Sequence, residues 1–313
     1  MSEATLTAQV ARVPGVAAVI AVLAVGFTAV NPSFATLGNL SNVASQSTVL
    51  LLMALPMTLI IMSEGLDLSM GAVVTLASVA LAMTVLSTGS IMMGLAAGLG
   101  VGLAFGVLNG ALIALLGIPP FVTTLGTMGV AQGLALVVTD GQSVVGMPKA
   151  LPYIYTGTLL GVPFPVWISI GAFLLVWWLL YRTRFGTYVF ALGGNREALR
   201  LAGVGDRTML IAVYALGGLM AGFASLIMTA RINSAHPTAA IGLEFDAIAA
   251  VALGGTSFEK GNGWLLGTVL GVVAVGILRN GLNLIAVPSS AQVACIGGLV
   301  IFALYLDGLK SRS

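Results

Sequence analysis

Two carboxylates in a largely apolar stretch are the first residues whose type and spacing could do chemistry. Glu64 and Asp67 lie in LPMTLIIMSEGLDLSMGAVVT, at the break between two apolar runs. Ionisable groups at membrane depth often mark catalytic pairs or proton relays. Alternatively Asp67, which follows the turn residue Gly65, caps the helix that begins after it. No histidine, basic partner or metal-ligand spacing accompanies the pair, and this favours the capping interpretation.

The other reactive residue types are isolated from one another. Cys295 is the single cysteine, so no disulfide or paired-cysteine redox site forms within the chain. His236 is the single histidine and precedes Pro237 in a polar loop, where Arg231 and Glu244 flank it as candidates for binding something outside. The sequence contains no phosphate-binding Walker loop, dinucleotide fingerprint or metal-ligand cluster. We therefore expect no catalytic residue, no metal site and no cofactor bound by this chain.

The composition places these residues in a membrane protein. Hydrophobic residues make up 58% of the chain and charged residues 7%, and the mean hydropathy is +1.09. A soluble domain carries about 25% charged residues. The net charge of +2 is too small to indicate nucleic-acid binding. The basic residues gather in loops beside apolar runs, as in a polytopic protein surrounded by a lipid bilayer.

Ten apolar segments are long enough, or nearly so, to cross a bilayer, which takes about 20 helical residues. They are 13–30, 43–62, 68–86, 91–117, 121–139, 161–181, 209–230, 245–256, 264–285 and 291–306. The eighth is short and is interrupted at Gly254 and Gly255, so eight or nine full spans plus a re-entrant segment is the alternative. We expect an all-α fold of about ten transmembrane helices in a single domain, 1–313.

The basic residues orient the segments. If the N-terminus is inside, nine of the twelve Lys and Arg residues fall in the cytoplasm, as the positive-inside rule requires. These nine are Arg12, Arg182, Arg184, Arg196, Arg200, Arg207, Lys260, Lys310 and Arg312. Lys149, Arg231 and Arg279 fall on or towards the outside. Removing the eighth segment would move Lys310 and Arg312 outside, so we retain it and place both termini in the cytoplasm.

Glycines recur every four residues in the fourth segment and again in the ninth. They are Gly94, Gly98, Gly102, Gly106 and Gly110, and then Gly263, Gly267 and Gly271. Small residues let helices approach closely where lipid supplies no hydrophobic drive. Tight packing within the chain is the favoured interpretation, and a subunit interface is the alternative.

Six uncharged polar residues inside the segments are the material for a weakly polar translocation path. They are Asn109, Thr123, Thr127, Gln132, Asn280 and Asn283. The alternative for each is a hydrogen bond to a neighbouring helix that serves packing alone.

The segment 182–207 is the most polar part of the chain, with seven of its 22 charged residues. Within it, Asn195 to Gly203 has the signals of a short helix: Asn195 as the cap, Glu197 in the first turn and Gly203 as the stop. A helix presented in this way at the cytoplasmic face can seat in a groove of another protein.

Four blocks of the sequence resemble the ribose/xylose/galactoside-type permeases of bacterial ABC importers. GTYVFALGGNREALRLAGV (186–204) is similar to their cytoplasmic loop, in which an alanine-and-glycine motif engages the ATPase subunit. EGLDLSMG (64–71), with Asp67, Ser69 and Gly71, is similar to their GGIDLSVG signature, and Glu64 stands where a small residue is usual. LEFDAIAAVALGGTSFEKGNGWLLGTVLG (243–271) and PFVTTLGTM (120–128) resemble two further blocks.

The resemblance implies a vitamin B12 importer-like (type II) permease fold in the bacterial inner membrane, working as a dimer with an identical copy or a paralogue. It implies transport of a sugar or sugar-like solute delivered by a periplasmic binding protein. ATP and Mg²⁺ would be bound by a separate cytoplasmic ATPase subunit. The residues that would couple to that ATPase are Gly193, Gly194, Asn195, Glu197, Ala198 and Gly203.

Two other classes compete with this interpretation. A secondary transporter driven by protons or sodium usually carries charges on broken helices near the midplane, whereas the charges here lie at segment ends. An intramembrane enzyme would need a nucleophile and base pair, which the sequence does not supply.

We predict that the segment 182–207 and the C-terminus lie on the same, cytoplasmic, side. Arg200→Cys and Ser311→Cys, each made in a Cys295→Ser background, should react with a membrane-impermeant maleimide only after the cells are permeabilised. Labelling of either cysteine in intact cells would contradict this topology.

Overall fold

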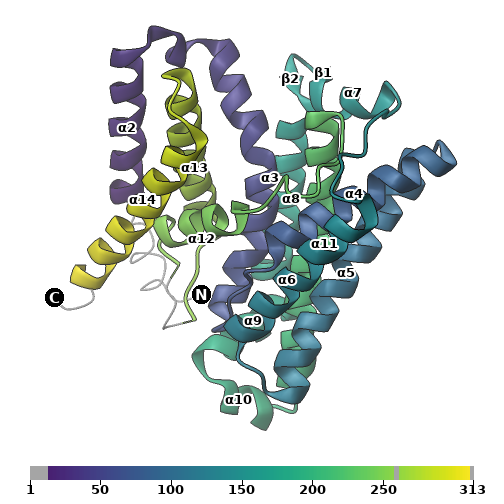
Figure 1. Ribbon diagram of the computed structural model, residues 1–313. Coiled ribbons are helices and arrows are strands. Elements are labelled where there is room, and N and C mark those ends of the chain that lie inside the picture. The colour runs from purple at the N-terminus through teal and green to yellow at the C-terminus, as the bar shows by residue number, and fades with distance from the viewer. Residues whose placement is uncertain (1–12, 257–260, 311–313) are drawn as a thin grey trace.

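The computed structural model describes residues 13–256 and 261–310 and is built almost wholly of helices (Figure 1). The long helices are α2 (Val13–Val30), α3 (Leu37–Met62), α4 (Met70–Thr88), α5 (Ile91–Leu116), α6 (Pro120–Thr139), α8 (Phe164–Arg182), α11 (Asp206–Ile232), α13 (Leu265–Leu284) and α14 (Ser289–Lys310). The short ones are η1 (Pro32–Ala35), α7 (Ala150–Thr156), α9 (Arg184–Gly194), α10 (Arg196–Leu201) and α12 (Leu243–Leu253). Strands β1 (Thr158–Leu159) and β2 (Val162–Pro163) pair as a small antiparallel hairpin. The all-α class is confirmed.

Helix α3 is the central element of the fold. It packs against α8, α11, α12 and α13, and every residue from Thr48 to Met62 is buried. In Figure 1, α2, α13 and α14 lie on one side of it and α4, α5, α6 and α11 on the other. Helices α9 and α10 lie at one end of the molecule, and the β1–β2 hairpin and α7 lie at the opposite end.

Each of the ten segments expected from the sequence coincides with a helix, but the count of ten full crossings is not confirmed. Within the described ranges, seven helices are long and apolar enough to cross a membrane: α3, α4, α5, α6, α8, α11 and α13. Helix α12 has 11 residues and so rises about 16 Å, about half of a hydrocarbon core of about 30 Å. Of the basic residues that set the expected topology, Arg12, Lys260 and Arg312 lie outside the described residues.

Glycines on either side explain why α12 is short. Gly242, just before it, and Gly255, just after it, have φ angles of 92° and 81°, in the left-handed region that glycine adopts at low cost. The loop before α12 turns back into the protein, where the buried Ala240 N–H donates to Thr75 Oγ1 of α4 at 3.1 Å. The eighth segment therefore contains a half-length helix, and the loop that precedes the segment runs into the protein.

The glycines of α5 bring its backbone directly against α11. A Cβ atom on Gly102 would collide with the carbonyl oxygen of Gly218, and one on Gly106 with that of Tyr214. In the same way, a Cβ atom on Gly271 of α13 would collide with the backbone of α12. Packing within the chain is thus confirmed for both glycine rows.

We predict that Gly102→Leu destabilises the protein by about 1–3 kcal/mol, the usual cost of overpacking a filled site. The matched control is Gly100→Leu, because a Cβ atom there meets nothing within 4 Å and leucine favours a helix over glycine by roughly 0.5–1 kcal/mol. Thermal unfolding in detergent should show a lower Tm for the first variant only. Equal Tm values for the two would show that the α5–α11 contact is dispensable.

Candidate functional site

The surface at the α10 end carries the residues expected to couple to a partner. Asn195 Oδ1 accepts a hydrogen bond from Ala198 N at 2.8 Å, so Asn195 caps α10 as the sequence indicates. Gly203 has a φ of 75° directly after the helix, which confirms it as the stop. Glu197 and Ala198 are exposed in the first turn, and Leu201 is 84% exposed. A short, well-capped helix therefore presents both charge and apolar surface at this end.

An ion-pair cluster that sequence reasoning missed ties α10 to α11. Arg196 Nε and Arg200 Nη2 each donate to Asp206 Oδ2 at 2.7 Å, and Asp206 is the first residue of α11. The hydrogen bond that Arg200 donates to Asp206 also raises the pKa of the Arg200 guanidinium above its ordinary value. These ion pairs therefore link α10 to the first turn of α11.

Helix α9 in turn contacts the end of α3. Gly193 is buried, and a Cβ atom on it would collide with the carbonyl oxygen of Met62, the last residue of α3. Gly194 is exposed, with open space around its Cα. Of the residues predicted to couple to an ATPase, Gly193 is thus buried against α3. The others are exposed, at the end of α9, on α10 and just after it.

The break between α3 and α4 is crossed by a chain of hydrogen bonds, here called the junction network: Asp67, Ser69, Asn109 and Thr127. Asp67 Oδ1 accepts from Ser69 N at 2.8 Å and from the Ser69 hydroxyl at 2.6 Å. Ser69 Oγ accepts from Asn109 Nδ2 at 2.8 Å, and Asn109 Oδ1 accepts from the Thr127 hydroxyl at 2.7 Å. All four side chains are buried, so the network joins α5 and α6 to the break.

The expected role of Asp67 as the cap of the following helix is wrong. Ser69 occupies the N-cap position of α4, and its side chain makes no capping bond. Asp67 instead closes a turn two residues earlier, and its side chain is 3% exposed. The turn is also held through the Leu66 carbonyl, which accepts from Thr124 Oγ1 at 3.2 Å and from Tyr214 Oη at 3.3 Å.

The rest of the EGLDLSMG block has a steric explanation. A Cβ atom on Gly71 would collide with Glu244 Oε2, so only glycine leaves room for that carboxylate. Glu244 is 2% exposed and accepts from Gly242 N at 3.0 Å, which corrects the expectation that it faces outside. Glu64 has a φ of 60°, in the left-handed region that glycine adopts at low cost. This geometry accounts for the small residue that is usual at this position in the family that the block resembles.

The six polar residues expected to line one path do not gather in one place. Asn109 and Thr127 meet in the junction network, and Thr123 is buried on the same helix as Thr127 with no hydrogen-bond partner for Oγ1 in the described part of the chain. Gln132 is half-buried further along α6. Asn280 pairs reciprocally with Asn39 at 2.8 and 3.0 Å.

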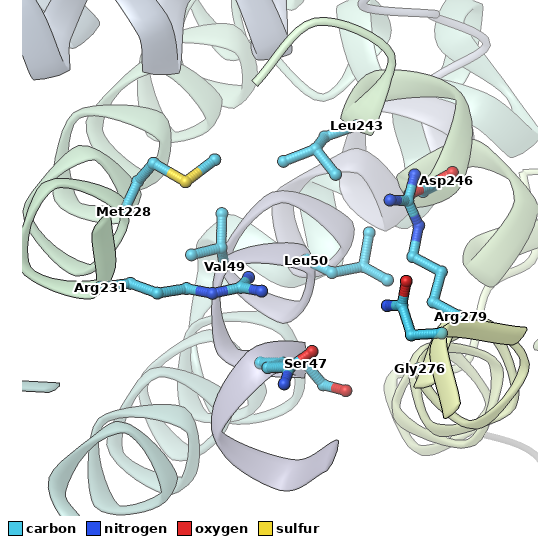
Figure 2. Close-up of a pocket in the computed structure, with 11 residues that line it drawn as sticks. Ser47, Val49, Leu50, Met228, Arg231, Leu243, Asp246, Gly276 and Arg279 are labelled. Atoms are coloured by element: carbon cyan, nitrogen blue, oxygen red, sulfur yellow. The ribbon is translucent and has the colours of Figure 1, made fainter. Parts of the chain in front are cut away.

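The sixth of these residues, Asn283, accepts from Gln292 Nε2 at 2.8 Å and lines a cavity of about 90 Å³ between α3, α11, α12 and α13 (Figure 2). Arg231 lies on one wall, and the ion pair of Asp246 with Arg279 lies on the other. Sequence reasoning overlooked Asp246, although an ionisable residue inside an apolar segment is a signal of a functional site.

Comparisons with known proteins place the chain among transport proteins. The family model described as "Branched-chain amino acid transport system / permease component" matches residues 39–304. The ribose import permease protein of Escherichia coli K12 is 40% identical over 90% of this chain and 88% of its own length. That of Bacillus subtilis is 38% identical (93% and 91%), and the D-allose transport system permease protein of E. coli K12 is 34% identical (94% and 91%).

No solved structure matches the chain. The family match nevertheless covers most of the sequence, from within α3 to within α14, and the described helices are those of a multi-pass membrane protein. This chain therefore belongs to the family of transport-system permease components.

Proposed function

We propose that this chain is the transmembrane permease subunit of an ATP-driven importer for a sugar or sugar-like solute delivered by a periplasmic binding protein. The observation that carries the proposal is the 40% identity to a ribose import permease over 90% of the chain. Permeases named for D-allose and L-arabinose transport are also similar, at 34% and 33% identity. All of these are sugars, and none of these relatives supports an ion-driven carrier.

The proposed assembly places the chemistry of ATP outside this chain. A cytoplasmic ATPase subunit binds ATP and Mg²⁺, and a second permease, an identical copy or a paralogue, completes the membrane part. The permease is one domain, 1–313, in the bacterial inner membrane, with both termini in the cytoplasm. In a vitamin B12 importer-like fold of about ten helices, the loop before α12 and α12 together make the eighth crossing.

The ATPase docks on α10 in this proposal, and the segment 182–207 couples its motion to the helices. Support comes from Glu197 and Leu201, which no other part of the described chain covers, so both side chains are exposed. Two contacts lead away from this surface: the ion pairs of Asp206 join α10 to α11, and Gly193 of α9 lies against the end of α3. In the proposal, movement passes through both. Tilting of α3 and α11 then opens and closes the path.

The test is uptake into proteoliposomes that contain this chain, its partner ATPase subunit and its binding protein. Radiolabelled D-ribose, D-allose or L-arabinose should accumulate only with ATP, and a protonophore should have no effect. Uptake driven by an imposed proton or sodium gradient without ATP would contradict the proposal.

We predict that Glu197→Lys disrupts docking of the ATPase. Reversing an exposed charge in the first turn of α10 should lower ATPase co-purification and transport by about tenfold or more, equivalent to about 1.4 kcal/mol or more at the interface. The ligand affinity of the binding protein should not change. Lys149→Glu, a charge reversal at the exposed start of α7 at the opposite end of the molecule, is the control. Normal co-purification of Glu197→Lys would exclude α10 as the docking element.

We also predict that Asn109→Leu weakens the junction network. It removes the hydrogen bonds to Ser69 and Thr127, each worth about 0.6 kcal/mol on average within a membrane. The Tm should fall modestly and transport should slow, while ATPase binding is kept. Gln132→Leu, on α6 outside the network, serves as the control. If both variants transport at the parental rate, the network is structural only.

A further inference from the structure

The cavity of Figure 2 has charged groups on two facing walls. On the α11 wall, the Arg231 side chain reaches towards the centre of the cavity. Its guanidinium makes no hydrogen bond or ion pair with any residue that the structure describes. Between the two walls, Val49 and Leu50 of α3 form an apolar floor, and Met228 of α11 also lines the cavity. This wall therefore offers a free cationic donor above an apolar surface.

The opposite wall combines donors and acceptors. Asp246 of α12 forms an ion pair with Arg279 Nη2 of α13. The Nε–H of the same Arg279 is buried and has no hydrogen-bond partner among the described residues. Asn283 of α13 and Gln46 of α3 add two amides to the lining. A ligand here would meet unused donors beside a carboxylate and amide oxygens.

The cavity lies far from the surface proposed to bind the ATPase. Helix α11 has 27 residues and is therefore about 40 Å long. Its first residue, Asp206, contacts α10, whereas Arg231 is in its last turn. Arg279 is likewise near the C-terminal end of α13. On the proposed topology, this is the side from which a solute arrives.

The charge balance selects the class of ligand. The two guanidinium groups and the one carboxylate give these three side chains a net positive charge, which repels a cation. An anion would gain from Arg231 but would face the Asp246 carboxylate on the opposite wall. A hydroxyl group both donates and accepts, so it fits a mixed set of arginine, carboxylate and amide groups. The apolar floor suits the C–H face of a sugar ring. The lining therefore matches a neutral polyol better than an ion.

The size of the cavity fixes how much of such a ligand it holds. A volume of about 90 Å³ corresponds to about three water molecules at about 30 Å³ each. It admits two or three hydroxyl groups, that is, one edge of a sugar. Contact with one edge gives selectivity without the tight binding that would slow release.

We propose that Arg231, Asp246 and Arg279 form a substrate-contact site that binds one hydroxylated edge of a sugar on its way through the permease and discriminates between sugars. This inference rests on the proposed function of sugar import. The proposed site takes the place of the six uncharged residues as the predicted lining of the path. It is charged, and it lies where α3, α11, α12 and α13 meet.

The first experiment measures uptake of radiolabelled D-ribose, D-allose and L-arabinose by Arg231→Met in proteoliposomes of the complete importer. Losing a charged hydrogen-bond donor should lower uptake below saturation by about tenfold or more and change the ratio of the three rates. Arg231→Lys should restore part of both, and ATPase co-purification should be unchanged. Lys149→Met, which removes an exposed cation that does not line the cavity, should behave as the parent. Parental rates and ratios in Arg231→Met would overturn the proposal.

The second experiment does not depend on transport. Ser47, which lines the cavity, is replaced by the isosteric cysteine (Ser47→Cys) in a Cys295→Ser background, and its reaction with methyl methanethiosulfonate is followed in membranes. At least one of the three sugars in excess should slow the reaction. No slowing by any of them, or slowing by inorganic phosphate alone, would overturn the site. Uptake by the parent that follows an imposed ion gradient and needs no ATP contradicts the proposed function instead, and the protection assay still decides the fate of the site.

Discussion

Backbone contact between α5 and α11 sets the frame on which the other helices are placed. Lipid offers no hydrophobic drive for helix association, so close van der Waals contact must supply it. Gly102 meets Gly218 with no side chain between them, and three other glycines of α5 repeat the contact along α11. This pairing fixes the position of α11, and α11 in turn carries Asp206 at one end and Arg231 at the other. The surface proposed to bind the ATPase and the polar cavity therefore lie at opposite ends of one helix that is packed closely against α5.

A second constraint acts on polar groups that are buried away from water, because each must find a hydrogen-bond partner within the protein. The break after α3 satisfies it with the junction network, in which the Ser69 hydroxyl donates to Asp67 and accepts from Asn109. The break thus consists of backbone held by three neighbouring helices, through Asn109, Thr124 and Tyr214. The sharp change of direction after α3 is thus held by hydrogen bonds between buried side chains.

Local signals predicted local structure well. The apolar segments and the cap and stop of α10 depend on residues adjacent in sequence, and the structure confirms them. The glycine rows also identified close helix contacts, although not their partners. The predictions that failed concern polar residues on the helices, because their partners depend on which way each helix face is turned in the fold. Asn280 faces Asn39 and Asn109 faces Thr127, so residues of one chemical kind went to separate places. The pairing of Asp246 with Arg279 joins two helices whose relative rotation no local pattern specifies.

The half-length of α12 has a consequence for how the chain enters the membrane during synthesis. Its 11 residues are too few to partition into lipid as an independent span, which takes about 20. Asp246 is in the first turn of α12 and Arg279 is near the end of α13, and either charge opposes insertion into lipid, at a cost that reaches about 2.5–3.5 kcal/mol at a helix centre. Backbone contact between α12 and α13 at Gly271 and the ion pair of Asp246 with Arg279 tie the two helices together. The translocation machinery must therefore release α12 and α13 as one hairpin, in which each charge is already neutralised by its neighbour.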